Sequence, residues 1–137
     1  MQKIGYITAL GLGLLFAAGQ TMAAQQIPKQ PIEFPQGKQR TRIAGALSGT
    51  RIIDYTIQAQ AGQLLSVTLD TDNPDNYFNL LPPEGKEPLF VGFTSGNQLN
   101  TQLPSSGEYR VRLYLLGSAA EHNANAHYQL SVYEPQG

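Results

Sequence analysis

The side chains best suited to hold a metal ion are two histidines and an adjacent glutamate. His122 and His127 are five residues apart, and Glu121 immediately precedes the first of them, in the loop 117–126. A catalytic zinc site normally uses three protein ligands and a structural site uses four. Glu121 is the only further ligand close in sequence, so we expect no metal site, and the sequence implies no cofactor.

A second group of oxygen ligands lies in the loop from Asp70 to Asn76, which has acidic residues at alternate positions. This spacing is similar to the start of a calcium loop, but Pro74 occupies the fifth place and Asp75 stands where an EF-hand needs glycine. Asp and Asn also favour turns, because their side chains accept hydrogen bonds from nearby backbone N–H groups. A turn is the favoured interpretation, and a calcium site is the alternative.

The sequence shows no combination of nucleophile and base. It has no cysteine and no Gly-x-Ser-x-Gly motif, and Ser48 and Ser106 lie in ordinary turn sequences. It also lacks a glycine-rich phosphate loop and an ordered pair of carboxylates on strands. We therefore predict that the protein is not an enzyme.

The residues best suited to binding lie on one alternating stretch, 107–116. One face is apolar, with Tyr109, Val111, Leu113 and Leu115, and the other carries Glu108, Arg110, Arg112 and Tyr114. Period-two alternation predicts a half-buried strand, which we place at the centre of a sheet. Arg and Tyr are enriched at binding hot spots, because they combine contact area with hydrogen bonding.

The partner of this strand decides how large the polar surface is. If 107–116 forms a hairpin with 126–133, one face contains Arg110, Arg112, Tyr114, Gln129, Ser131 and Tyr133. This face is either a binding surface or an exposed sheet in which arginine stems cover tyrosine rings. The second interpretation is slightly favoured.

The other apolar residues also fall into short alternating runs. Strands are expected at 41–47, 51–59, 64–70, 77–81, 88–93, 98–103, 107–116 and 126–133, separated by Gly, Pro and Asn turns. Seven or eight short strands predict an all-β fold, an antiparallel β-sandwich. Its inward residues include Tyr55, Ile57, Val67, Leu69, Tyr109, Val111, Leu113, Leu130 and Val132. At most one helical turn is expected, at 119–122.

The N-terminus has the pattern of a cleaved secretory signal peptide, 1–23. Lys3 precedes an apolar run, 4–18, and small residues follow before a cleavage site after Ala23 or Ala24. The apolar run is shorter than the about 20 residues of a membrane span. Residues 24–39 are rich in Gln and Pro and predict an extended arm, with Ile32 and Phe34 added as an edge strand. Residues 40–137 are expected to form one domain.

Composition narrows the class of partner. The 137-residue chain has a net charge of −1, which becomes −2 when Lys3 is removed, and a mildly acidic protein is a poor nucleic-acid binder. Basic residues gather at 29–51 and acidic residues at 70–87. This asymmetry could steer a partner, although two solvated edges are the simpler interpretation.

The strand at 107–116 also belongs to a motif with a known parallel. Ser106-Gly107-x-Tyr109-x-x-Arg112, followed by Ala120, resembles the signature of the periplasmic inhibitors of g-type (goose-type) lysozyme. Residues 55–67 resemble that family's second and third strands and the turn joining them. The pair 77–78 and the stretch 128–132 fit as well, so the resemblance spans about 43–133. The Gly62-Gln63 turn (the Gly-Gln turn) and the Ser-Gly-x-Tyr strand also resemble those of pre-peptidase C-terminal-type sandwiches.

The inhibitor resemblance implies an antiparallel β-sandwich and a non-catalytic periplasmic protein whose partner is a g-type lysozyme. In that family a loop after the Ser-Gly-x-Tyr strand carries two arginines that engage the lysozyme's active-site groove. Counted from Arg112, those positions here are Gly117 and Glu121, so both positive charges are absent. The expected partner-binding residues are Ser106, Arg110, Arg112, Tyr114, Gly117, Glu121 and His122. The second resemblance implies instead a cell-envelope accessory module that binds glycan or supports other domains.

Overall fold

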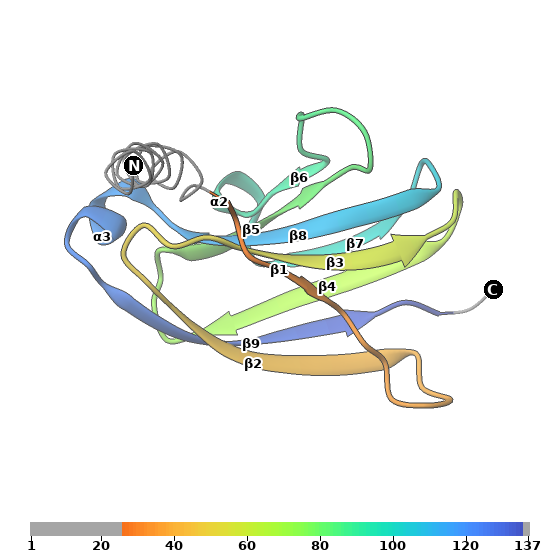
Figure 1. Ribbon diagram of the computed structural model, residues 1–137, viewed down its shortest axis with the longest axis horizontal. Helices are drawn as coiled ribbons and strands as arrows, with labels where there is room; N and C mark the ends of the chain where they lie inside the picture. Colours follow the sequence, from red (N-terminus) through yellow and green to blue (C-terminus); the bar gives the residue numbers. More distant parts are fainter. Residues whose placement is uncertain (1–25, 136–137) are drawn as a thin grey trace, which may run out of the picture.

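The computed structural model describes residues 26–135, which form two β-sheets packed face to face (Figure 1). The strands are β1 (Lys29–Pro31), β2 (Arg40–Ser48), β3 (Ile53–Ala59), β4 (Leu64–Thr71), β5 (Asn76–Leu81), β6 (Phe90–Val91), β7 (Gln98–Gln102), β8 (Gly107–Leu115) and β9 (Asn125–Tyr133). Sheet A has the order β1-β3-β8-β5-β6, and sheet B has the order β2-β9-β4-β7. The predicted antiparallel sandwich is confirmed. The predicted signal peptide lies outside the described residues.

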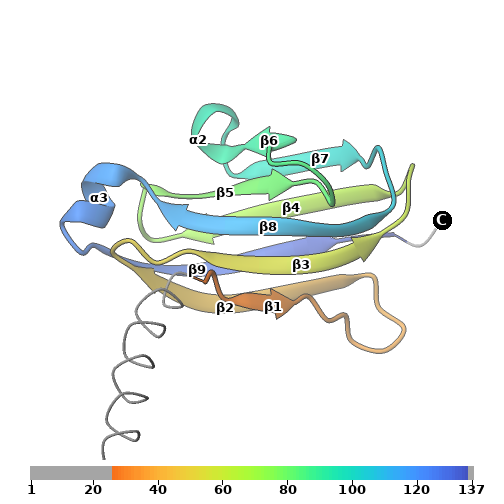
Figure 2. The ribbon, with the colours of Figure 1, turned by 45° about the horizontal axis from the view of Figure 1, so that its top comes forward.

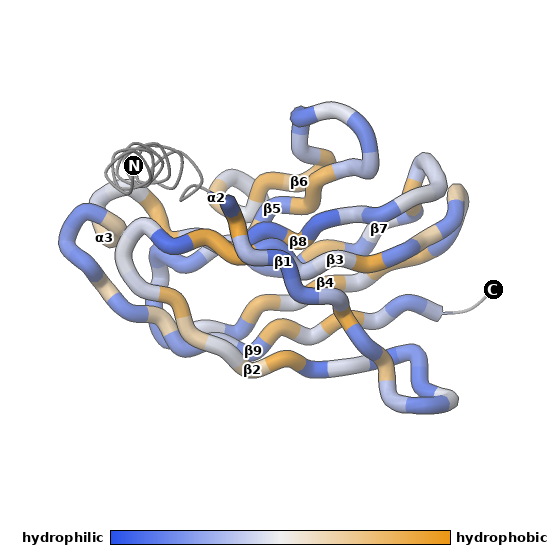
Figure 3. Tube along the Cα trace, viewed as in Figure 1, coloured by the Kyte–Doolittle hydropathy of each residue, from blue (hydrophilic) through white to orange (hydrophobic). Residues whose placement is uncertain are grey.

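Strand β8 occupies the centre of sheet A, where its length as the longest unbroken run predicts it. It pairs antiparallel with β3 on one side and β5 on the other. Its apolar residues are buried between the sheets, and Tyr109, Val111 and Leu113 are each 0% exposed. All nine residues predicted to point inward are buried, and Figure 3 shows the matching alternation of hydropathy along the strands.

A pair of tyrosines joins the two sheets inside the core. The Tyr55 hydroxyl on β3 lies 2.6 Å from the Tyr128 hydroxyl on β9, and the two rings meet edge to face. Tyr128 is paired in register with Gly45 on β2. A Cβ atom at position 45 would overlap with the Tyr128 ring and hydroxyl, so glycine makes room for the ring. Burial raises the pKa of Tyr128.

The arm preceding β2 adds an edge strand to sheet A, but not with the residues expected. Strand β1 pairs parallel with β3, and the Asp54 N–H donates to the Pro28 carbonyl at 2.9 Å. Ile32 and Phe34 follow the strand instead of forming it: Ile32 is buried in the core, and Phe34 packs against it.

The connections differ from the sequence prediction in two places. The weak strand expected at 88–93 is only β6, and the helical turn α2 (Gly92–Ser95) follows it. Gly92 allows this turn to approach β5, because a Cβ there would lie 2.5 Å from the Phe78 carbonyl oxygen. The second short helix, α3 (Gly117–Glu121), overlaps the single turn expected at 119–122, so α2 is the helical turn that was not expected.

The predicted hairpin between 107–116 and 126–133 is wrong. β8 belongs to sheet A and β9 belongs to sheet B. The chain between them contains α3 and crosses from one sheet to the other at one end of the sandwich, as Figure 2 shows. A hairpin needs a loop of only about 2–5 residues. Among residues 26–135, no helix is long and apolar enough to cross a membrane.

Candidate functional site

The outer face of sheet A centres on an ion pair between neighbouring strands. Arg112 on β8 is opposite Asp54 on β3, and its Nε and Nη2 donate to the two carboxylate oxygens at 2.8 and 3.0 Å. Asp54 is 1% exposed, while the Arg112 side chain is 27% exposed. The hydrogen bonds to Asp54 raise the pKa of Arg112. Arg112 therefore has a bidentate partner inside the fold, which limits its availability to a ligand.

The N-terminal arm explains why an outward-facing aspartate is buried. Residues 26–29 pass beside the ion pair and, with Asp54, Arg110 and Arg112, line a hollow of about 780 Å³. Arg110 donates from Nη2 to the Pro82 carbonyl at 3.3 Å. Neither Lys29 nor Arg110 forms an ion pair with any of residues 26–135. The surface beside the paired Arg112 thus carries uncompensated positive charge.

Aromatic rings continue this face toward β5 and α2. The Tyr114 hydroxyl donates to Asn79 Oδ1 at 2.8 Å, and its ring centroid is 6.4 Å from that of Tyr77. Phe93 of α2 packs edge-on against Tyr77, at 5.8 Å, and is 57% exposed. Burial raises the pKa of Tyr114. A sheet face that carries both exposed rings and cationic side chains is the kind of surface that proteins use to bind other proteins.

The Ser-Gly-x-Tyr motif joins two turns at one end of the sandwich. The Tyr109 hydroxyl donates to the Ser105 carbonyl at 2.6 Å and accepts from the Ser105 N–H at 3.1 Å. The Ser106 hydroxyl accepts from the Ala61 N–H at 2.9 Å, which ties this turn to the Gly-Gln turn. Gly107 has φ +144°, and a Cβ there would lie 2.7 Å from the Pro83 side chain. Each motif residue thus has a role in the fold.

The other end of the sandwich carries the α3 loop. Gly117, Glu121 and His122 are all exposed. Beneath them a small apolar cluster of Leu115, Ala119, Ala120 and Ala126 packs the loop against the sandwich. A Cβ at Gly117 would meet no atom within 4 Å. The loop therefore presents exposed positions on a packed support.

The seven predicted binding residues do not form one cluster. Ser106 and Gly117 flank opposite ends of the nine-residue strand β8, which is roughly 30 Å long at about 3.3 Å per residue. Arg110, Arg112 and Tyr114 lie between them on the outer face of sheet A. Gln129, Ser131 and Tyr133, which were expected beside the arginines, belong to sheet B.

Sequence reasoning missed Asp54, Asn79, Tyr77 and Phe93, which contact the predicted residues. Asp54 carried one signal, a charged residue at an outward position of an alternating strand. Its pairing with Arg112, 58 residues away, depends on which strands become neighbours.

The metal-ligand candidates are held by other contacts. His127 Nδ1 lies 3.1 Å from Asp72 Oδ2, and the His127 N–H donates to Asp72 Oδ1 at 2.8 Å, a bond that lowers the pKa of Asp72. His122 Nδ1 is 2.8 Å from the Ser118 carbonyl oxygen. No group of three His, Cys, Asp or Glu residues within 26–135 is arranged to hold a metal ion.

The loop 70–76 uses its own oxygens to form a turn. Asn73 Oδ1 accepts from the Asp75 N–H at 2.8 Å, and Thr71 Oγ1 accepts from the Asn73 N–H at 3.2 Å. Asn76 is buried and donates from Nδ2 to the Tyr114 carbonyl at 3.1 Å. The Asn73 and Thr71 side chains thus accept from the backbone two residues further on, as in the turns that Asn and Thr favour.

Among the comparisons with known proteins, only the one with solved structures finds similar proteins. The sequence matches no protein-family model and no curated protein. The structure is similar to PliG of Aeromonas hydrophila, a periplasmic lysozyme inhibitor of g-type lysozyme. The TM-score is 0.74, with 24% identity over 80% of this chain and 98% of that chain. PliG of Salmonella Typhimurium, with the same description, has a TM-score of 0.62 and 20% identity over 80% of this chain and 100% of its own.

A third structure represents the second resemblance. The pre-peptidase C-terminal domain of collagenase from Bacillus anthracis has a TM-score of 0.58 and 18% identity over 79% of this chain and 97% of that domain. Both resemblances inferred from the sequence are thus confirmed as likenesses in structure. At 18–24% identity they establish the fold that this chain shares with these proteins.

Proposed function

We propose that this protein is an exported, non-catalytic binding protein of the periplasm whose partner is a lysozyme. The observation that carries this proposal is the likeness to Aeromonas hydrophila PliG over 98% of that chain at a TM-score of 0.74. The outer face of sheet A supports it, because aromatic and cationic side chains share that face. A lysozyme cleft contains catalytic carboxylates, which such cations complement.

The proposed contact surface consists of two parts with different tasks. Arg110 and Tyr114 on β8 and the exposed positions Gly117, Glu121 and His122 of the α3 loop face the partner. Arg112 positions the side chains next to it on β8 by binding Asp54, whereas Ser106 joins two turns at the other end of that strand. Glu121 weakens binding to a cleft that carries a carboxylate, since like charges repel when water is displaced from between them.

The decisive experiment restores the missing charges. The double variant Gly117→Arg/Glu121→Arg should inhibit g-type lysozyme more strongly than the natural chain, or inhibit it where the natural chain does not. Arginine can form two parallel hydrogen bonds to a carboxylate, so each new pair is expected to contribute about 1–3 kcal/mol, and 1.4 kcal/mol is a tenfold change in affinity. The measurement is a titration of lysis rate against inhibitor concentration.

The matched control is Gly117→Gln/Glu121→Gln, which removes the negative charge without adding a positive one. It should fall between the natural chain and the double-arginine variant. A double-arginine variant that folds normally and leaves g-type lysozyme fully active would overturn the inhibitor proposal. Assays with c-type and i-type lysozymes define which lysozyme class is bound.

The likeness to the collagenase domain supports one alternative, a cell-envelope accessory module that binds glycan or stabilises other domains. Retention of the natural chain on purified peptidoglycan, together with no effect on any lysozyme, would favour this alternative.

A further inference from the structure

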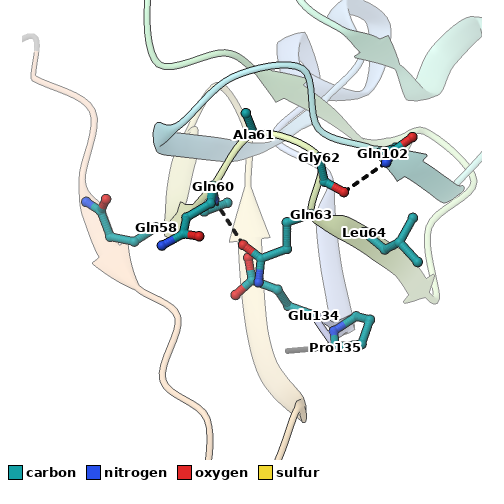
Figure 4. Close-up of a pocket in the computed structure, with 10 residues that line it drawn as sticks. Gln58, Gln60, Ala61, Gly62, Gln63, Leu64, Gln102, Glu134 and Pro135 are labelled. Carbon is teal, nitrogen blue, oxygen red and sulfur yellow. Dashed lines mark hydrogen bonds between the residues drawn. The ribbon is translucent and has the colours of Figure 1, made fainter. Parts of the chain in front are cut away.

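The end of the sandwich opposite α3 (Figure 1) contains a second hollow, separate from the proposed lysozyme-binding surface and shown in Figure 4. Its volume is about 940 Å³. It is lined by the end of β3, the β3–β4 turn, the start of β4, the end of β7 and the residues after β9: Gln58, Ala59, Gln60, Ala61, Gly62, Gln63, Leu64, Gln102, Glu134 and Pro135. Most of the polar groups are neutral amides, and Glu134 is the one charged side chain among these ten residues.

Glu134 is the unusual member of this set. It is only 4% exposed, and its Oε2 has no hydrogen-bond partner among residues 26–135. Its backbone N–H donates to the Gln39 carbonyl at 2.9 Å, which fixes the residue just beyond the last strand. Neither ion pair found in the described part of the chain involves it. Leaving a buried carboxylate oxygen without a donor is costly, so a donor from a ligand would bind favourably.

The walls of the hollow are held in place before any ligand binds. Gln63 Oε1 accepts from the Gln60 N–H, and Gln102 Nε2 donates to the Gly62 carbonyl, each at 3.0 Å. The Gly62 N–H donates to the Leu103 carbonyl at 2.7 Å. Figure 4 shows the Gln60, Gln63 and Glu134 side chains gathered in this space. A ligand entering it would not need to order the backbone of these turns, which lowers the entropic cost of binding.

From this geometry we propose that the hollow binds an alkylammonium group, with the ammonium donating to Glu134. An ammonium has three N–H donors, and the glutamine amide oxygens around Glu134 can accept those that the carboxylate does not. Leu64, which is 55% exposed, and Pro135 provide an apolar wall for the methylene stem. No basic side chain lines the hollow to compete for Glu134.

A second carboxylate adds to the preference for a cation. Gln58 Nε2 donates to Glu108 Oε2 at 3.5 Å, which places an exposed negative charge at the rim. Burial raises the pKa of Glu134, as expected for a carboxyl group that lacks a partner. Two sources supply an alkylammonium group, a free small amine and the lysine side chain of a polypeptide.

The test is an NMR titration of the 15N-labelled full chain with n-butylammonium chloride at pH 7 and constant chloride concentration. We expect saturable shifts of the amide signals of residues 60–64, 102 and 134. The neutral isostere n-butanol should give none. A titration with no saturable shift of these signals would overturn the proposal.

Two matched variants identify the carboxylate. Glu134→Gln keeps the side-chain shape and should weaken butylammonium binding roughly tenfold or more, because it removes a charge-assisted hydrogen bond. Glu108→Gln should change the affinity by less than about twofold, because a contact with an exposed charge is weak. Equal binding by Glu134→Gln, or loss of binding in Glu108→Gln alone, would contradict the assignment.

A measurement on the natural chain makes the test independent of whether the variants fold. The carboxyl carbon of Glu134, followed by 13C NMR against pH, should report a lower pKa when butylammonium is present, because a bound cation favours the carboxylate. An unchanged pKa at saturating amine would also refute the proposal. Tighter binding of the acetylated and amidated peptide Gly-Lys-Gly than of butylammonium assigns the site to polypeptide lysine, and weaker or equal binding assigns it to free amines.

Discussion

Asp54 and Glu134 are both buried carboxylates, but the fold treats them differently. Asp54 lies in the middle of sheet A and receives two hydrogen bonds from Arg112. Glu134 lies at the open end of the sandwich, where β9 has already ended, and its Oε2 has no partner among residues 26–135. A strand in mid-sheet has neighbours on both sides that can supply a counter-charge at a fixed register. The end of a sandwich has none, so an equally buried group there can remain available to a ligand.

The largest effect is expected when the ion pair between Asp54 and Arg112 is broken. Arg112→Ala leaves Asp54 buried without its donors, and removing one partner of a buried pair costs about 3–5 kcal/mol. Because Arg112 is 27% exposed, we expect about 2–4 kcal/mol of lost unfolding free energy. Urea denaturation at pH 7 measures it. The control Asp54→Leu/Arg112→Met, which removes both charges, should be clearly more stable than Arg112→Ala, and if it is not, the pair has no such role.

A smaller effect of opposite sign is expected at the unsatisfied carboxylate. Glu134→Gln replaces a buried carboxyl group by a neutral amide of the same shape, and burying a neutral amide costs less than burying a charge. We expect the variant to be more stable than the natural chain at pH 7, in the absence of amines. Thermal unfolding in phosphate buffer measures this difference. A clear loss of stability would show that Glu134 has a stabilising partner.

The smallest expected effect is the pH dependence of the stability difference between Glu134→Gln and the natural chain. The pKa of Glu134 is raised in the folded state, so its protonated form is favoured by folding. The protonated Glu134 side chain stabilises the folded state. This stabilisation is fully present below the unfolded pKa of about 4.3 and is lost as pH rises through the folded pKa. The stability advantage of Glu134→Gln should therefore shrink toward acid pH and reach a constant value above the folded pKa. Denaturation curves of the variant and of the natural chain, compared at each of several pH values, measure this trend. An advantage that grows toward acid pH would contradict the prediction.

The sequence predicted the part of the molecule that depends on short-range pattern. Alternation in 107–116 placed β8 correctly, because burial of one face imposes period two on the residues themselves. The same alternation in the other strands placed Val67, Leu130 and the remaining inward residues in the core. The hairpin of β8 with β9 failed for a topological reason, because nothing in the 116–124 connection states that the chain changes sheets.

The candidate sites needed the structure. Asp54 and Arg112 meet because β3 and β8 become neighbours, and neither residue carries that information alone. Glu134 follows the last alternating run and resembles an ordinary polar tail in the sequence. It lines one hollow with the β3–β4 turn and the end of β7, which are distant along the chain.

The contact between Gly45 and Tyr128 has a consequence for how this sequence can change over generations. A side chain at position 45 becomes acceptable only if the ring at position 128 is lost or moves away. Loss of Tyr128 would in turn leave the Tyr55 hydroxyl without its partner inside the core. The residues at these three positions, on three different strands, therefore depend on one another. Among homologous sequences they should vary together, and a single exchange at any one of them should be removed by selection.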